Sequence, residues 1–104
     1  MENRKLSICM IGFGNAGKEF CRLLIKKREE IKDTYNFDVI VTAISTKSKG
    51  ALYDPVGVDL NRALHEAETE GKFSQDNPQR VDGSTLEIIQ KSGADVLVEL
   101  STLS

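Results

Sequence analysis

An apolar segment at residues 8–11 runs without a break into the motif Gly12-x-Gly14-x-x-Gly17, and apolar residues at helical spacing follow. Strand, tight turn and helix in this order are typical of a dinucleotide-binding fold. Gly12 would permit the turn, Gly14 would let a pyrophosphate approach the backbone, and Gly17 would let the helix pack closely on the strand. The first N–H groups of the helix would then face the anion. A glycine-rich turn without a ligand is the alternative.

The next elements follow from the pattern of apolar residues. Helical spacing of Phe20, Leu23, Leu24 and Ile31 predicts a helix that faces a sheet with these side chains and ends near Asp33 or Thr34. Residues 37–45 are β-branched and almost continuously apolar, which predicts a second strand covered on both faces. A strand, a crossover helix and a second strand form a βαβ unit, so we expect parallel pairing and a right-handed crossover.

The remaining segments complete the prediction. Residues 50–58 are expected to form an irregular linker, and residues 73–82 a loop with at most a short edge strand. One helix should begin at the N-cap Asp59 and end at Gly71, and a second should begin with the capping box Ser84–Glu87 and end at Gly93. Residues 94–100 should form a strand beside the first, on the side opposite the second. The predicted fold class is α/β: a partial Rossmann-like, doubly wound parallel sheet, comprising the first half and the strand across the switch point.

The residues after the second strand bear on cofactor choice. An acidic residue there would favour NAD, because it would accept hydrogen bonds from the ribose hydroxyls. This chain instead has Ser45-Thr46-Lys47-Ser48-Lys49, which offers hydroxyls and cations to a ribose phosphate. We therefore predict NADP as the cofactor, with NAD as the alternative. A flexible polar loop that contacts only water is the competing interpretation.

Composition excludes several other classes of function. The net charge of −2 gives no general attraction to nucleic acid or to acidic membranes, and no apolar stretch is long enough to span a bilayer. The first five residues lack a secretory signal, so the cytoplasm is the expected location. Cys9 and Cys21 have neither metal-ligand nor redox spacing and are expected to be buried, unpaired thiols. His65 is expected to be exposed on its helix, and the sequence indicates no metal site.

The order of these elements resembles the N-terminal nucleotide-binding domain of homoserine dehydrogenase. The resemblance covers essentially the whole chain and depends most on the linker leading to Gly57-Val58-Asp59-Leu60 and on the strand Asp95-Val96-Leu97-Val98-Glu99. It implies an NAD(P)-dependent interconversion of aspartate semialdehyde and homoserine, on the route to threonine and methionine. It also implies a small-molecule substrate and a homo-oligomer for the full-length enzyme.

The resemblance assigns cofactor contacts residue by residue. The pyrophosphate loop comprises Gly12, Phe13, Gly14, Asn15, Ala16 and Gly17. The adenosine-ribose side comprises Ser45, Thr46 and Lys47, and the nicotinamide side comprises Ser101 and Thr102. The last segment lacks the proline usual in the family.

The catalytic lysine, the substrate-binding acids and the dimerising region of the family belong to a later part of the chain, so no catalytic residue is assigned here. We expect residues 1–104 to form one NAD(P)-binding domain of a longer chain. This domain alone should bind cofactor weakly or not at all and should not turn over substrate.

Three alternatives remain at this point. The chain could be the cofactor domain of a dihydrodipicolinate reductase-like protein or of an aspartate semialdehyde dehydrogenase-like protein. It could also be a nucleotide-sensing module without catalytic activity. The open edge of the predicted sheet is expected to favour dimers.

Overall fold

A five-stranded sheet forms the centre of the structure, a computed structural model that describes residues 4–100. The strand order is β4-β3-β2-β1-β5, where the strands are β1 (Arg4–Ile11), β2 (Phe37–Ser45), β3 (Ala51–Tyr53), β4 (Arg80–Val81) and β5 (Val96–Glu99). Strand β1 pairs in parallel with both β2 and β5. This parallel centre confirms the Rossmann-like prediction, and β5 lies where expected, beside β1 and opposite β2.

The far edge of the sheet differs from the predicted arrangement. The expected irregular linker contains β3, which pairs antiparallel with β2 from Ser45 opposite Ala51. The reversal is closed by Thr46, whose hydroxyl donates to the carbonyl of Gly50 at 2.6 Å and accepts from the N–H of Lys49 at 2.8 Å. The two-residue β4 then pairs antiparallel with β3, as the short edge strand that the sequence allowed.

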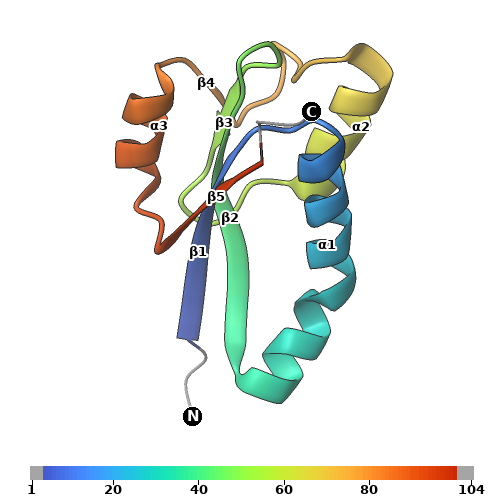
Figure 1. Cartoon of the computed structure of the whole chain (residues 1–104), viewed down its shortest axis with the longest axis vertical. Coiled ribbons are helices and arrows are strands. Elements are labelled where there is room, and N and C mark those ends of the chain that lie inside the picture. Colours follow the sequence, from blue (N-terminus) through green and yellow to red (C-terminus); the bar gives the residue numbers. More distant parts are fainter. Residues whose placement is uncertain (1–3, 101–104) are drawn as a thin grey trace.

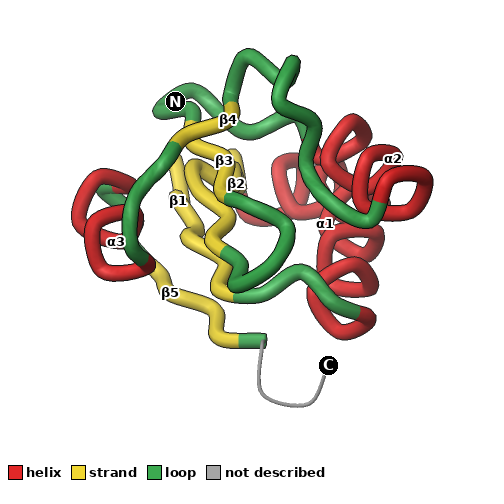
Figure 2. The backbone as a smooth tube through the Cα atoms, turned by 90° about the horizontal axis from the view of Figure 1, so that it is seen from above, coloured by secondary structure: helices red, strands yellow, loops and turns green. Residues whose placement is uncertain are grey.

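Within residues 4–100, three helices cover the two faces of the sheet (Figure 1). Helices α1 (Asn15–Tyr35) and α2 (Leu60–Glu70) lie on one face, and α3 (Thr85–Ser92) lies on the other, as the view from above shows (Figure 2). The core divides accordingly. The cluster on the α1 and α2 side includes Met10, Phe13, Val41, Leu52 and Phe73, and the cluster on the α3 side comprises Cys9, Ile11, Ala43, Ala51 and Ile88.

Helix ends follow the capping signals in the sequence. Helix α1 ends at Tyr35, one residue beyond the predicted end, where Asn36 adopts a left-handed conformation and donates to the carbonyl of Lys32. The carboxylate of Asp59 accepts from the N–H of Arg62 and caps α2, and Gly71 ends this helix with φ of 74°. Helix α3 has the predicted capping box between Ser84 and Glu87.

One predicted core residue of α1 is on the surface. Leu23 was expected to face the sheet, but its side chain is 54% exposed, so this prediction was wrong. It lies with Phe20, Lys27 and Ile31 on one flank of α1. Helix α2 contacts the other flank, where Arg22 forms a 2.6 Å ion pair with Glu68. The apolar face of α1 is therefore wider than its contact with the sheet. Within residues 4–100, only the flank next to α2 is covered.

The two cysteines are fully buried and unpaired, as predicted. Cys9 belongs to the α3 side of the core and Cys21 to the α1 side. Burial raises the pKa of the Cys21 thiol to about 11, although Arg28 and Arg22 act in the opposite direction. Both thiols therefore act as small apolar core groups.

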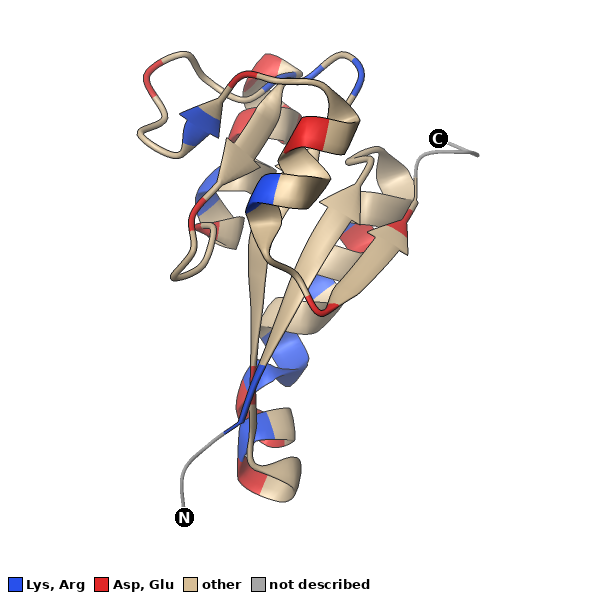
Figure 3. Cartoon of the chain, turned by 90° about the vertical axis from the view of Figure 1, so that its left-hand side faces the viewer, with Lys and Arg blue, Asp and Glu red and all other residues tan. Residues whose placement is uncertain are grey.

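Surface charge is of mixed sign. Both basic and acidic residues lie along α1 (Figure 3). His65 is exposed on α2, as predicted. Among the helices of residues 4–100, none has the length and apolar character needed to cross a bilayer.

Candidate nucleotide-binding site

The glycine turn follows β1 and is hydrogen-bonded to the end of β2. Gly12 has φ of 99°, a conformation that L residues rarely adopt, and its N–H donates to the carbonyl of Ser45 at 2.8 Å. A Cβ placed at Gly17 would lie 2.8 Å from the carbonyl oxygen of Gly12. The turn and the close approach of α1 to β1 therefore both require glycine, as the motif predicted.

The N-terminus of α1 differs from those of the other helices. Asp59 and Ser84 cap α2 and α3 with their side chains, whereas the N-cap residue of α1 is Gly14, which has no side chain. The first turn of α1, like that of α2, contains no acidic residue. The first N–H groups of α1 are thus left for water or for an anion at the positive end of the helix dipole.

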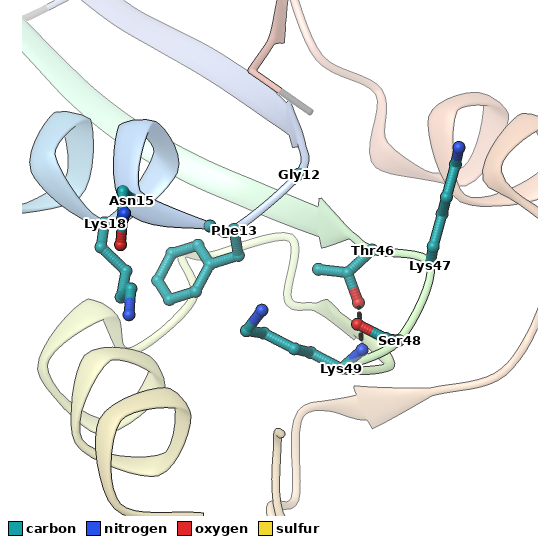
Figure 4. Close-up of a pocket in the computed structure, with 9 residues that line it drawn as sticks. Gly12, Phe13, Asn15, Lys18, Thr46, Lys47, Ser48 and Lys49 are labelled. Carbon is teal, nitrogen blue, oxygen red and sulfur yellow. Dashed lines mark hydrogen bonds between the residues drawn. The ribbon is translucent and has the colours of Figure 1, made fainter. Parts of the chain in front are cut away.

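A hollow of about 370 Å³ lies between this turn and the loop after β2. Its lining comprises Gly12, Phe13, Gly14, Asn15, Lys18, Thr46, Lys47, Ser48 and Lys49. Three of these residues are lysines and none is acidic. Figure 4 shows that Lys18 and Lys49 extend into the space beside the Phe13 ring, whereas Lys47 extends away from it. The hollow therefore suits an anionic group.

A second hollow of about 260 Å³ lies at the carboxyl ends of β1, β2 and β5. It is lined by Ile11, Gly12, Ser45, Thr46, Lys47, Thr85 and Glu99. Strand β1 lies here between β2 and β5, and the helices α1 and α3 cover opposite faces of the sheet. The carboxyl ends of the strands at such a point are the usual place for a nucleotide in an open α/β sheet. Lys47 borders both hollows.

The structure gives different surroundings to the predicted adenosine-side residues. Ser45 is 2% exposed, and its hydroxyl lies 3.3 Å from that of Thr85. The Thr46 hydroxyl closes the loop as described above. Lys47 alone of the three is exposed.

The predicted pyrophosphate-loop residues are brought together at the same turn. Asn15 and Ala16 are exposed at the start of α1. The Phe13 side chain is buried against Phe73, so it borders the hollow from within the core. Ser101 and Thr102 lie outside the described residues.

Sequence reasoning assigned no contact to three residues of the hollow, Lys18, Ser48 and Lys49. Lys49 was counted among the cations of its loop but was not assigned a contact, and Lys18 was not considered. A signal for Lys18 was present, because it directly follows Gly17 in the first turn of the predicted helix. Within residues 4–100, no group of three or more His, Cys, Asp or Glu side chains is placed to hold a metal ion.

Comparisons with known proteins agree with this geometry. No family model matches the chain. Over 96 residues it is 33% identical to a homoserine dehydrogenase of Methanocaldococcus jannaschii, covering 92% of this chain and 28% of that protein. It is 29% identical to the solved structure of a putative homoserine dehydrogenase from Archaeoglobus fulgidus, with a TM-score of 0.71, covering 91% of this chain and 27% of that one.

A third relative has the same fold. It is a hyperthermophilic archaeal homoserine dehydrogenase mutant solved in complex with NADPH, with a TM-score of 0.78 and 23% identity. The match covers 95% of this chain and 29% of that one, so the chain spans less than a third of the length of each relative. Sequence, strand order and the glycine turn together show that this chain is a homologue of homoserine dehydrogenases and corresponds to their N-terminal, nucleotide-binding part.

Proposed function

We propose that this chain binds NADP(H) and serves as the cofactor-binding part of an enzyme that interconverts aspartate semialdehyde and homoserine. The observation that carries the proposal is the hollow beside the glycine turn, whose lining among residues 4–100 includes three lysines and no carboxylate. A second phosphate on the adenosine ribose distinguishes NADP from NAD, and it would meet positive charge here. The NADPH complexes of the archaeal relatives support the same cofactor.

In this proposal, different residues of the chain contact different parts of the cofactor. The backbone from Gly12 to Gly17 and the open N-terminus of α1 would hold the pyrophosphate. Lys49 and Lys18 would contact the ribose phosphate, and Lys47 would act from the side of the second hollow. Ser45 and Thr46 would shape the adenosine side through the backbone and the loop. Ser101 and Thr102 remain proposed contacts of the nicotinamide ribose on the basis of the family resemblance.

The reaction itself is a proposal for the whole enzyme. The nicotinamide, when bound, would exchange a hydride with the terminal carbon of the substrate. No residue of this chain is assigned a catalytic role, because the family's catalytic lysine and substrate-binding acids belong to a later region. We also propose a cytoplasmic location, which the two unpaired thiols support, and a homo-oligomeric state.

The test uses two ligands that differ only in the ribose phosphate. Calorimetric titration of this chain with adenosine 2′,5′-bisphosphate and with adenosine 5′-monophosphate reports the contribution of that phosphate directly. Titrations with NADPH and NADH provide the same comparison for the whole cofactor. We expect tighter binding of the bisphosphate and of NADPH. Equal affinity for the paired ligands would contradict the choice of NADP.

Lysine variants locate the contact. Lys49→Ala should weaken bisphosphate binding about tenfold or more, because a hydrogen bond to a charged group contributes ~1.5–3 kcal/mol. Binding of the monophosphate should change less than about twofold, since its only phosphate is held at the glycine turn. Lys26→Ala is the matched control, because it removes the same charge from an exposed position of α1 outside the hollow. Gly14→Val should abolish binding of both ligands.

A further inference from the structure

The two walls of the lysine-lined hollow come from separate loops. Residues 12–18 form one wall, and residues 46–49 form the other. Their bases are joined where Gly12 donates to the carbonyl of Ser45, but Lys49 lies four residues further along its loop. A phosphate that contacts both walls requires the outer part of this loop to stand at a fixed distance from the glycine turn.

One residue far away in the sequence contacts both walls. Phe73 is fully buried, and its ring packs against that of Phe13 with 5.4 Å between centroids and an interplanar angle of 57°. Its N–H donates to the carbonyl of Lys49 at 2.9 Å. Phe73 thus connects the glycine turn to the lysine that extends into the hollow.

The carbonyl of Phe73 makes a further contact with the lysine loop. It accepts a hydrogen bond from the guanidinium of Arg80. This guanidinium packs against Gly50, where an added Cβ would lie 2.7 Å from the Arg80 Nε. The residue after Lys49 is therefore held by Arg80, and Arg80 is held by Phe73.

The segment that carries Phe73 is itself anchored to α2. The buried carboxylate of Glu66 accepts from the N–H of Ser74 and from the side-chain amide of Asn77, both at 3.0 Å. Phe73 is therefore fixed from the side of α2 as well as from the two loops. The Phe73 backbone therefore has an anchor on α2, through Ser74, in addition to its contact with the lysine loop.

The backbone of Lys49 is fixed at both of its polar groups. Its N–H donates to the Thr46 hydroxyl, and its carbonyl accepts from Phe73. The first contact is internal to the loop, so only the second relates Lys49 to the glycine turn. The direction in which the Lys49 side chain leaves the loop depends on both contacts.

We propose that Phe73 is a positioning residue that sets the distance between the glycine turn and Lys49, and thereby the preference for a phosphorylated ribose. The inference rests on the proposed function and extends it to a residue that lines neither hollow. Loss of the Phe73 ring removes its contact with Phe13 and allows the lysine loop to shift. The pyrophosphate contacts at the glycine turn do not depend on this ring.

The measured quantity is the ratio of the dissociation constants for adenosine 5′-monophosphate and adenosine 2′,5′-bisphosphate. Phe73→Leu should reduce this ratio at least about fivefold, while the constant for the monophosphate changes less than about twofold. Phe13→Leu removes the same ring contact from the other side, so it should lower the ratio as well. The double variant should lose no more than either single variant, because all three lack one shared contact.

Val39→Ala is the control for general loss of stability. Val39 is buried in the amino-terminal half of β2, away from the loop that follows this strand. Its substitution should lower stability and leave the ratio unchanged. Circular dichroism verifies that each variant is folded at the temperature of the titration, and Phe13→Leu serves if Phe73→Leu is not folded.

The outcomes separate the two proposals. A folded Phe73→Leu chain that keeps the wild-type ratio overturns the positioning role alone. A reduced ratio in Val39→Ala also overturns it, because the effect would then follow from lost stability. A wild-type chain with no preference between the two ligands overturns the proposed function, and the inference falls with it.

Discussion

Gly14 and Gly17 lie in the same turn, but a side chain is expected to have different effects at the two positions. A Cβ at Gly17 would lie 2.8 Å from the carbonyl oxygen of Gly12, so either the turn or α1 must move. We expect Gly17→Ala to lower the free energy of unfolding by about 1–3 kcal/mol, the usual cost of overpacking. Gly14 has φ of −82°, which any L residue adopts, so Gly14→Ala should cost less than about 1 kcal/mol.

Urea unfolding of both variants measures this difference. Gly14→Ala should retain most of the stability and lose nucleotide affinity. The main effect of Gly17→Ala should be a loss of stability. An equal loss of stability in the two variants would contradict the separate tasks assigned to these glycines.

At the residue scale, the sequence indicated which residue types surround the hollow but not how they point. Lys47 was assigned to the ribose side from its place after the second strand, yet it extends away from the Phe13 ring, while Lys49 extends toward it. The difference arises from the loop backbone. Its shape depends on the Thr46 hydroxyl and on Phe73, which is 24 residues further along the chain than Lys49. No local pattern contains that contact.

At the scale of elements, Glu66 links α2 to the loop before β4. Its side chain is almost fully buried and accepts from Arg62 at 2.7 Å, in addition to Ser74 and Asn77. Glu66→Gln should lower the free energy of unfolding by about 1–3 kcal/mol, because the amide leaves part of this donor set unsatisfied. Glu68→Gln, on the exposed face of the same helix, should cost less than about 1 kcal/mol.

The same carboxylate gives stability a defined pH dependence. Burial by itself raises the pKa of Glu66, but hydrogen bonds from Arg62, Asn77 and Ser74 outweigh burial, and the pKa is lowered. The stabilisation is therefore complete above the unfolded value of about 4.3 and is lost as the pH falls through the lower folded value. Glu66→Gln should flatten the acid limb of a stability profile, and Asp54 and Glu87, whose pKa values are also lowered, should leave part of that limb in place. An unchanged acid limb would contradict this account.

Elements with local signals were predicted well, and those that depend on distant partners were not. The second strand has the predicted bounds, and Asp59 and Ser84 cap their helices because capping is decided within one turn. Strand β3 was missed because its three residues become a strand only by pairing with β2. No local pattern predicts the burial of Glu66, since two of its three donors, Ser74 and Asn77, lie outside α2.

At the scale of the whole molecule, the two edges of the sheet are unequal. Strand β4 forms one edge and is two residues long. Strand β5 forms the other edge, where Val96 and Leu97 are 39% and 51% exposed. An exposed apolar edge strand pairs readily with another copy. We expect sedimentation velocity to show a concentration-dependent dimer, and Leu97→Lys to shift the chain toward monomer. A wild-type chain that is monomeric at every concentration would contradict this prediction.

The separation of the two buried thiols between the layers of the core gives this chain a pair of internal reporters. Cys9 belongs to the layer under α3, and Cys21 belongs to the layer under α1. A thiol reagent reaches Cys9, on β1, only after α3 has moved off the sheet. It reaches Cys21, which belongs to α1, only after α1 has separated from the sheet and from α2, so each labelling rate records the opening of one layer. Comparison of the two rates would tell whether the α1 layer and the α3 layer open together or as independent cooperative units, without adding any probe to the protein.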